Sequence, residues 1–340
     1  MSFKDDFEKS VNNPHDAAFK AAFKKILVAK KFFQTYFPEE IVKLIDFDRL
    51  ELGNKSYVDE KLREKHSDVI YRTKFKDSDA FLYILFEHQS KPDPMMVFRL
   101  LCYMVNIWKE YLDQNPKAKC LPVIFPAVLY HGKTRWNAPR TLSGLLEGDD
   151  ILSEYIPDFT YKVYDLGDYP DEMLMISNYM ALDVVLYIFK HISDNNFREI
   201  LSNAVTMLAK INDRKTYLEF FEWLLRYTYH ARNEDENTVR GYIDCEVEKL
   251  KDENVRRLAM TVAEQIRQRG KIEGLEEGKT IISSLLIDQL QDRFGSISLD
   301  IEYRLKQSNT EILNKFGRSI FRFKNLADAE KWWEAHGTEH

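Results

Sequence analysis

Two strand-like runs joined by a short polar segment constrain the fold more than any other feature of the chain. The runs, 68–75 and 81–89, are rich in aromatic and branched residues, and the sequence Lys-Asp-Ser-Asp at 76–79 separates them. This pattern predicts a β-hairpin. Because side chains alternate along a strand, every second residue of each run lies on the same face of the sheet.

The register of this hairpin decides which side chains meet. A two-residue loop at 77–78 pairs Lys76 with Asp79. The same register places Asp68 opposite Glu87. Directly opposed side chains have Cβ atoms about 5 Å apart, so two carboxylates there repel each other unless a cation joins them. We therefore expect a divalent metal ion between them.

Gln89 completes the candidate catalytic set, since it shares a strand face with Glu87. Carboxylate oxygens suit Mg²⁺ or Mn²⁺, and such an ion activates water and stabilises charge on a phosphate. Asp68 and Glu87 are thus predicted metal ligands for phosphodiester hydrolysis. A solvated rim position is the alternative, but Glu87 follows the apolar run 81–86, where a charge needs a partner.

Two helices are predicted beside the hairpin. Apolar residues recur at helical spacing over 14–37, where Pro38 provides a stop, and 95–112 is apolar on most sides, as in a largely buried helix. The first helix carries lysines with no acidic residue between them, among them Lys20 and Lys24. This basic flank is either a solvated face or a phosphate contact.

Further strands are predicted at 121–130 and 159–166, and Pro122 and Pro126 confine the first of these to a sheet edge or a distortion. A hairpin, helices and further strands together indicate a mixed sheet flanked by helices. We assign 1–168 to an α/β domain.

The rest of the chain is predicted to be mostly helical, with a helical region at 169–245, a charged linker at 246–279 and a small terminal unit at 280–340. Glycine costs a helix up to about 1 kcal/mol against alanine, so three glycines in the linker suggest a weak helix or a close-packed seam between helices. They recur at every fourth position: Gly270, Gly274 and Gly278. Pairing of two copies through this helical tail is an expectation that light scattering can test.

Composition excludes several classes of protein. A formal charge of -6 argues against a protein that coats nucleic acid, and three widely spaced cysteines offer neither a disulfide framework nor a zinc site. The first ten residues do not resemble a secretory signal, and no apolar run approaches the roughly 20 residues of a membrane helix. We expect a cytoplasmic protein. Motifs of P-loop proteins, α/β-hydrolases and zinc proteases are absent from the sequence.

Four short motifs resemble the Rpn recombination-promoting nucleases, also called YhgA-like transposases, a family of the PD-(D/E)XK superfamily. They are PHDAAFK at 14–20, SDVIY at 67–71, FEHQS at 86–90 and the segment 99–103. Their order and spacing are specific, and the match is best from His15 to about Gly148. The resemblance implies a restriction-endonuclease-like core.

The resemblance also implies roles for individual residues. Asp68 corresponds to the central aspartate of the superfamily, Glu87 to its second acidic residue, and Asp16 to an accessory acidic position that is a further candidate metal ligand. Gln89 stands where lysine is usual in the superfamily, and its amide can orient water or phosphate without supplying charge. The implied activity is Mg²⁺-dependent cleavage of DNA with low sequence specificity, which promotes recombination.

Two other functions remain open from the sequence: a non-catalytic DNA-binding or assembly module of the same fold, and a nuclease acting on RNA. Candidates for DNA contact or structural bracing are His15, Arg99 and Tyr103, together with the two lysines of the basic flank. We favour a structural role for His15. Arg99 and Tyr103 share a helix face, from which bracing of Glu87 is favoured over contact with a phosphate.

Overall fold

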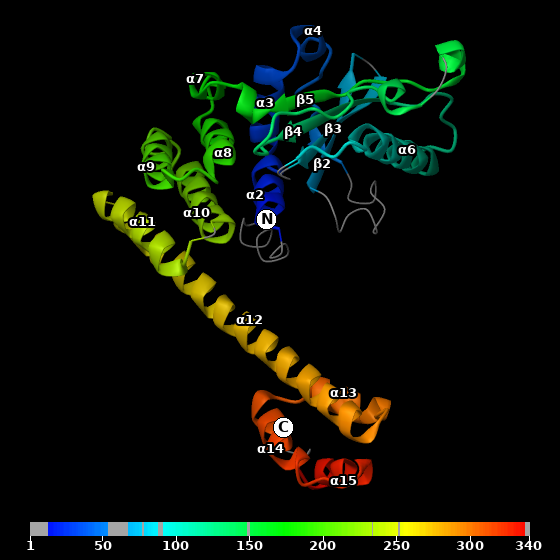
Figure 1. The fold of residues 1–340 in the computed structure, drawn as a ribbon. Coiled ribbons are helices and arrows are strands. Elements are labelled where there is room, and N and C mark those ends of the chain that lie inside the picture. The colour runs from blue at the N-terminus through cyan, green and yellow to red at the C-terminus, as the bar shows by residue number, and fades with distance from the viewer. Residues whose placement is uncertain are drawn as a thin grey trace. The chain divides into compact units, whose positions relative to one another are not determined.

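The computed structural model describes residues 13–53, 67–76, 78–87, 91–147, 150–232, 234–250 and 252–336 (Figure 1). The chain divides into two compact units, Met1–Val262 and Ala263–His340, and each is described by itself. None of the helices in these ranges is long and apolar enough to cross a membrane.

A mixed five-stranded sheet forms the centre of the first unit. Its strands lie in sequence order, and β2 pairs antiparallel with both β1 and β3, whereas β4 runs parallel to both β3 and β5. The strands are β1 (Glu51–Leu52), β2 (Ser67–Phe75), β3 (Ser78–Glu87), β4 (Val123–Tyr130) and β5 (Lys162–Asp165). With the flanking helices and the helical C-terminal region, this sheet confirms the predicted α/β fold class.

The hairpin of β2 and β3 is confirmed, but its loop begins one residue earlier than predicted. Phe75 pairs with Ser78, and Lys76 has a φ of 55°, in the left-handed region that lysine rarely adopts. The backbone N–H of Lys76 donates to the carbonyl of Leu44 at 3.1 Å, and Ile45 bridges to Phe75. A segment distant in sequence therefore holds the turn.

This shift changes the partner of Asp68 without changing its face. Asp68 pairs with Leu85, so the predicted pairing with Glu87 is wrong. Moving the loop by one residue moves each cross-strand pair by two, which preserves the alternation of side chains. Asp68 and Glu87 are consequently diagonal neighbours on one face, where Cα atoms lie about 7–8 Å apart.

Helices cover both faces of the sheet (Figure 1). On one face lie α2 (Pro14–Phe23) and α3 (Ile26–Tyr36), where the rings of Phe33 and Tyr71 are 5.2 Å apart. On the other face lies α6 (Met96–Gln114), which contributes to a core that includes Tyr83, Leu85 and Val128. The α6 face is the one that carries Asp68 and Glu87.

The first predicted helix is two helices, because Lys25 between them has extended backbone angles. The carbonyl of Phe23, in the last turn of α2, accepts a 2.6 Å hydrogen bond from the hydroxyl of Tyr71 on β2. A carbonyl near a helix end is available for such a bond. The sheet thus secures the end of α2, which no local sequence signal predicts.

Replacing Tyr71 by Phe is expected to lower the free energy of unfolding by about 1 kcal/mol, the usual net worth of one buried hydrogen bond. Tyr71 is fully buried, so the carbonyl of Phe23 loses this donor without gaining water. Urea denaturation measures the change. The control is Tyr155→Phe, at a side chain that is 80% exposed; equal effects of the two changes would contradict the argument.

Strand β4 is not an edge strand, so that part of the prediction is wrong. It lies between β3 and β5, but β5 pairs only with residues from Ala127 onward. Pro126 precedes this pairing and therefore interrupts no hydrogen bond between β4 and β5. Pro122 lies outside the strand, and its carbonyl accepts a hydrogen bond from Trp108.

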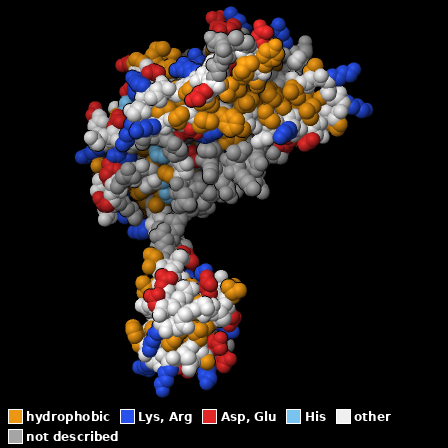
Figure 2. All heavy atoms as spheres, turned by 45° about the vertical axis from the view of Figure 1, so that its right-hand side comes forward, with side chains coloured by type: hydrophobic (Ala, Val, Ile, Leu, Met, Phe, Trp, Pro, Cys, Tyr) orange, Lys and Arg blue, Asp and Glu red, His pale blue; other side chains and the backbone are white. Residues whose placement is uncertain are grey.

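Helix α6 is buried along one side only, which is less than the sequence predicts. Phe98 and Leu112 are among its exposed residues, at 47% and 42%. Figure 2 shows hydrophobic side chains gathered on part of the surface of the first unit.

The region after the sheet is helical, as predicted. Helix α10 packs against α2 and forms the main connection between this region and the sheet layers. The elements in the rest of the first unit are α4 (Glu39–Val42), η2 (Ser143–Leu145), η3 (Asp150–Tyr155), η4 (Leu166–Asp168), α7 (Asp171–Leu174), α8 (Met180–His191), α9 (Phe197–Leu208), α10 (Arg214–Ala231) and α11 (Glu236–Lys249).

Helix α12 (Glu253–Phe294) is helical throughout, including at the three regularly spaced glycines. It ends as predicted at Phe294, followed by Gly295 with a φ of +83°. A Cβ added at Gly278 would meet no atom of the described chain within 4 Å, so packing against those atoms does not require a glycine there. The second unit has its own core around Phe316 and is completed by α13 (Leu299–Gln307), α14 (Thr310–Ile320) and α15 (Leu326–His336).

Candidate active site at one end of the sheet

Three strands bring their polar ends to one end of the sheet. Because β2 runs antiparallel to β3 and β4 runs parallel to it, the start of β2 lies beside the ends of β3 and β4. Asp68 is the second residue of β2, Glu87 is the last residue of β3, and Glu87 pairs with Tyr130 at the end of β4. The structure therefore brings together the two predicted metal ligands.

Asp68 lies beside two tyrosines. The hydroxyl of Tyr83 donates to Oδ2 of Asp68 at 3.3 Å, and the rings of Tyr83 and Tyr103 are 5.4 Å apart. Burial raises the pKa of Tyr103 to about 12, and the negative charge of Asp68 adds to this rise. Burial also raises the pKa of Tyr83, so both phenols stay protonated at neutral pH, where Tyr83 acts as a donor to the carboxylate.

Glu87 is buried, with 3% of its surface exposed, and it faces a cation on α6. Nη1 of Arg99 lies 3.4 Å from Oε2 of Glu87 and 2.6 Å from Oδ2 of Asp93. Burial lowers the pKa of Arg99, but the hydrogen bond to Asp93 and the charge of Glu87 outweigh it, so this pKa lies above its ordinary value. Arg99 is in position to brace Glu87, which is the role the sequence favoured.

The first turn of α2 reaches the same end of the sheet. The rings of His15 and His131 lie 5.1 Å apart, and the backbone N–H of His131 donates to the carbonyl of Glu87 at 3.3 Å. Asp16 is 7% exposed in this turn, which is capped by Asn13. The structure thus places His15 and Asp16 on the element that adjoins the ends of β3 and β4.

His15 has an internal partner on a distant helix. Its Nδ1 atom lies 2.7 Å from the hydroxyl of Tyr227 on α10, within hydrogen-bond distance. This contact supports the structural role favoured for His15, and a contact of His15 with DNA stays a prediction.

Sequence reasoning missed three residues at this end of the sheet: Asp93, His131 and Tyr227. His131 directly follows a strand parallel to the one that ends at Glu87, and this adjacency was a usable signal. Asp93 lies in the loop before α6, and Tyr227 is 212 positions from His15, so no periodic pattern connects either of them to the site.

Part of the basic flank of α2 and α3 forms ion pairs within the protein. Lys25 pairs with Glu219 at 2.8 Å, and Lys30 approaches Asp48 at 3.4 Å. Lys20 and Lys24 are half-buried, and their contact with DNA stays a prediction. Gln89 lies outside the described residues, as does the neighbouring His88.

The carboxylates fit a divalent ion in donor chemistry. Within the described ranges no three His, Cys, Asp or Glu residues form a metal-binding group. A role of Asp16 as a metal ligand stays a prediction. Mg²⁺ is commonly held by only one or two protein carboxylates, with water and substrate phosphate as the other ligands. Two diagonal carboxylates on adjacent strands meet that requirement.

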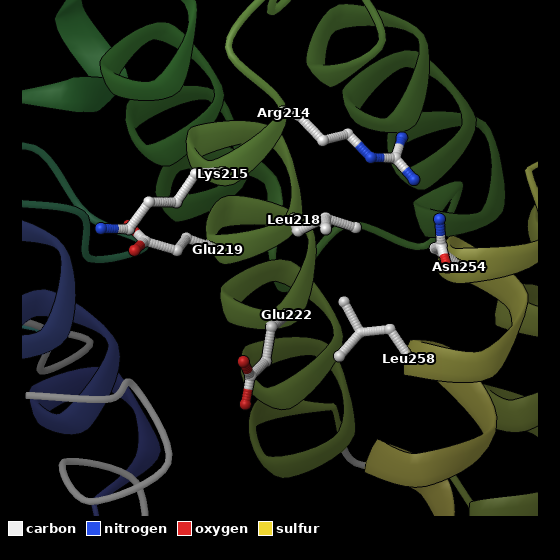
Figure 3. Close-up of a pocket in the computed structure, with 7 residues that line it drawn as sticks. All are labelled: Arg214, Lys215, Leu218, Glu219, Glu222, Asn254 and Leu258. Carbon is white, nitrogen blue, oxygen red and sulfur yellow. The ribbon is translucent and has the colours of Figure 1, made fainter.

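A groove elsewhere in the first unit has a different character. It encloses about 520 Å³ between α10 and the beginning of α12, where Leu218 and Leu258 point into it (Figure 3). Its walls include charged side chains that are held in ion pairs, such as Arg214 with Asp252 and Glu219 with Lys25. None of its lining residues belongs to the candidate active site.

The fold and the site define an α/β protein whose acidic residues gather at one end of a mixed sheet. A family model described as "Putative transposase, YhgA-like" matches residues 13–219, a span that includes Asp16, Asp68, Glu87 and Arg99 but ends before Tyr227. The chain belongs to this family, which confirms the resemblance of its sequence motifs.

Curated relatives give the same assignment. The recombination-promoting nuclease RpnD of Escherichia coli O157:H7 is 30% identical over 201 residues, which cover 59% of this chain and 76% of RpnD. RpnA of E. coli K12, with the same description, is 28% identical over 78% of this chain and 87% of its own. RpnE of that strain, described as an inactive recombination-promoting nuclease-like protein, is 29% identical over 80% of this chain and 87% of its own. No solved structure matches the chain.

Proposed function

We propose that this chain is a metal-dependent nuclease with a PD-(D/E)XK active site, which cleaves DNA with little sequence preference and so promotes recombination. The observation that carries the proposal is the placement of Asp68 and Glu87 on one face of adjacent strands, with Glu87 almost fully buried. The names of RpnD and RpnA support a nuclease activity.

In this proposal, some of the described residues bind the metal ion and others orient its ligands. Asp68 and Glu87 hold a Mg²⁺ or Mn²⁺ ion, with Asp16 as a further acidic residue at the same end of the sheet. When bound, such an ion lowers the pKa of water and neutralises charge on the phosphate. Tyr83 fixes the carboxylate of Asp68 by donating to Oδ2, and Arg99 restrains Glu87.

Gln89 is proposed to orient the attacking water or the phosphate through its amide, since it follows Glu87 by two positions. An amide carries no charge, so stabilisation of the phosphate falls to the metal ion and to nearby cations. Slow turnover is the expected consequence.

A non-catalytic DNA-binding or assembly module is the second candidate. The observation in its favour is that RpnE of E. coli K12 is described as inactive although it is 29% identical over 80% of this chain. This function requires the same fold but no bound metal.

Nicking of a supercoiled plasmid distinguishes the two functions. The wild-type chain is expected to nick the plasmid in Mg²⁺ or Mn²⁺ and to lose this activity in EDTA. A matched single-stranded RNA and DNA pair, assayed together, reports which nucleic acid is the substrate. If neither the plasmid nor the RNA is cut in either metal, the nuclease is rejected in favour of the binding module.

A further inference from the structure

The helical region that follows the sheet contacts α2, whose first turn lies beside the candidate active site. Helix α10 makes three successive contacts with the N-terminal helices, one on each turn. Glu219 pairs with Lys25 at 2.8 Å, and the indole of Trp223 donates to the carbonyl of Ala18 at 2.9 Å. One turn further along, Tyr227 reaches His15, and this last contact lies beside Asp16.

These contacts define an antiparallel pairing of α2 and α10. The residues on α10 are four apart, which places them on one face of that helix. Their partners descend along the chain from Lys25 to His15, so the pairing ends at the first turn of α2. That turn carries Asp16 and adjoins the end of β4.

A second contact reinforces the first from α8. The ring of Phe189 stacks on His131 at 5.8 Å and meets the ring of Tyr227 at 5.5 Å. Phe189 and Tyr227 are fully buried, so neither ring can move without opening the packing. His131 in turn donates its backbone N–H to the backbone carbonyl of Glu87 at 3.3 Å.

We propose that Tyr227 is a positioning residue of the active site. Through His15 it fixes the first turn of α2 and with it Asp16, and through the His15–His131 contact it restrains the strand ends that carry Glu87. The helical region then supports the active site of the nuclease through Tyr227. This inference rests on the proposed function, because it assigns to Tyr227 the support of a metal site.

The test compares Tyr227→Phe with the wild-type chain in Mn²⁺ binding, measured by isothermal titration calorimetry. The variant loses one hydroxyl and keeps its ring. Residues that hydrogen-bond directly to metal ligands typically contribute 10-fold to 100-fold to metal affinity or activity. Tyr227 acts through His15 and His131, so the half-saturating Mn²⁺ concentration is expected to rise by about 10-fold, the lower end of that range.

The matched control is Tyr187→Phe. The Tyr187 hydroxyl bonds to Asn203 at 3.2 Å in the same helical region, away from the sheet ends. This variant loses a comparable hydrogen bond and is expected to leave Mn²⁺ binding unchanged. Should Tyr227→Phe melt below the assay temperature, Phe189→Leu provides the same test from α8.

The outcomes separate the two proposals. Mn²⁺ binding by the wild type with unchanged affinity in Tyr227→Phe would overturn the positioning role alone. Binding without plasmid nicking would overturn the nuclease, while the effect of Tyr227→Phe on affinity still decides the positioning role. Absence of Mn²⁺ binding in the wild type would overturn both.

Discussion

Replacing Asp68 by Asn is expected to slow metal-dependent DNA cleavage by about 1000-fold. The change keeps the shape of the side chain and removes the negative charge that binds the cation. A bound metal contributes several kcal/mol of transition-state stabilisation, and each 1.4 kcal/mol corresponds to a factor of ten in rate. Glu87→Gln is expected to have an effect of similar size. Single-turnover nicking of a plasmid, with identically purified proteins, measures both.

The hairpin itself offers the control for these variants. Asp79 lies on β3 at the opposite end from Glu87, where it pairs with Arg72 at 3.6 Å. Asp79→Asn therefore removes a carboxylate from the same hairpin without touching the candidate site. A cleavage rate that falls equally in Asp79→Asn and Asp68→Asn would contradict a specific role for Asp68.

Replacing Arg99 by Met is expected to destabilise the protein by about 3 kcal/mol in the absence of metal, because a buried ion pair that loses one partner leaves a poorly compensated charge. The side chains of Arg99 and Glu87 are only 16% and 4% exposed, so water compensates little. Millimolar Mg²⁺ should restore part of the loss, since an ion bound only by the native state stabilises it. Urea denaturation with and without Mg²⁺ measures both effects.

Two control variants test whether the recovery in Mg²⁺ is specific to the Arg99–Glu87 pair. Arg226 pairs with Glu222 at 2.8 Å on α10, and its side chain is 5% exposed. Arg226→Met should also lower stability, but without recovery in Mg²⁺. The double variant Arg99→Met/Glu87→Gln should be more stable in EDTA than Arg99→Met, because it removes the charge that Arg99 compensates. Equal Mg²⁺ recovery in both arginine variants would exclude a metal at Glu87.

The sequence predicts the face shared by Asp68 and Glu87 better than it predicts their pairing. Alternation along a strand depends only on parity, so an error of one residue in the loop leaves the two carboxylates on the same side. The loop position itself depends on Lys76, whose positive φ is held by a hydrogen bond to Leu44. That contact joins segments about thirty residues apart, and no local pattern encodes it.

For the same reason, the sequence predicts some neighbours of Glu87 and misses others. Arg99 was assigned to brace Glu87 because both lie in regular elements with readable periods. Tyr227 and His131 were not found, since their relation to Glu87 arises from how α10 and β4 pack in three dimensions. Hydrophobic periodicity specifies which side of an element is buried but not which neighbour it meets.

The pairing of α2 with α10 also bears on the order of events during synthesis. His15 and Tyr227 are separated by 212 positions, so α2 leaves the ribosome long before its partner. At roughly 5–20 residues per second, the interval is about ten to forty seconds. A nascent chain that already holds Asp68 and Glu87 therefore still lacks Tyr227, the partner of His15 in the first turn of α2.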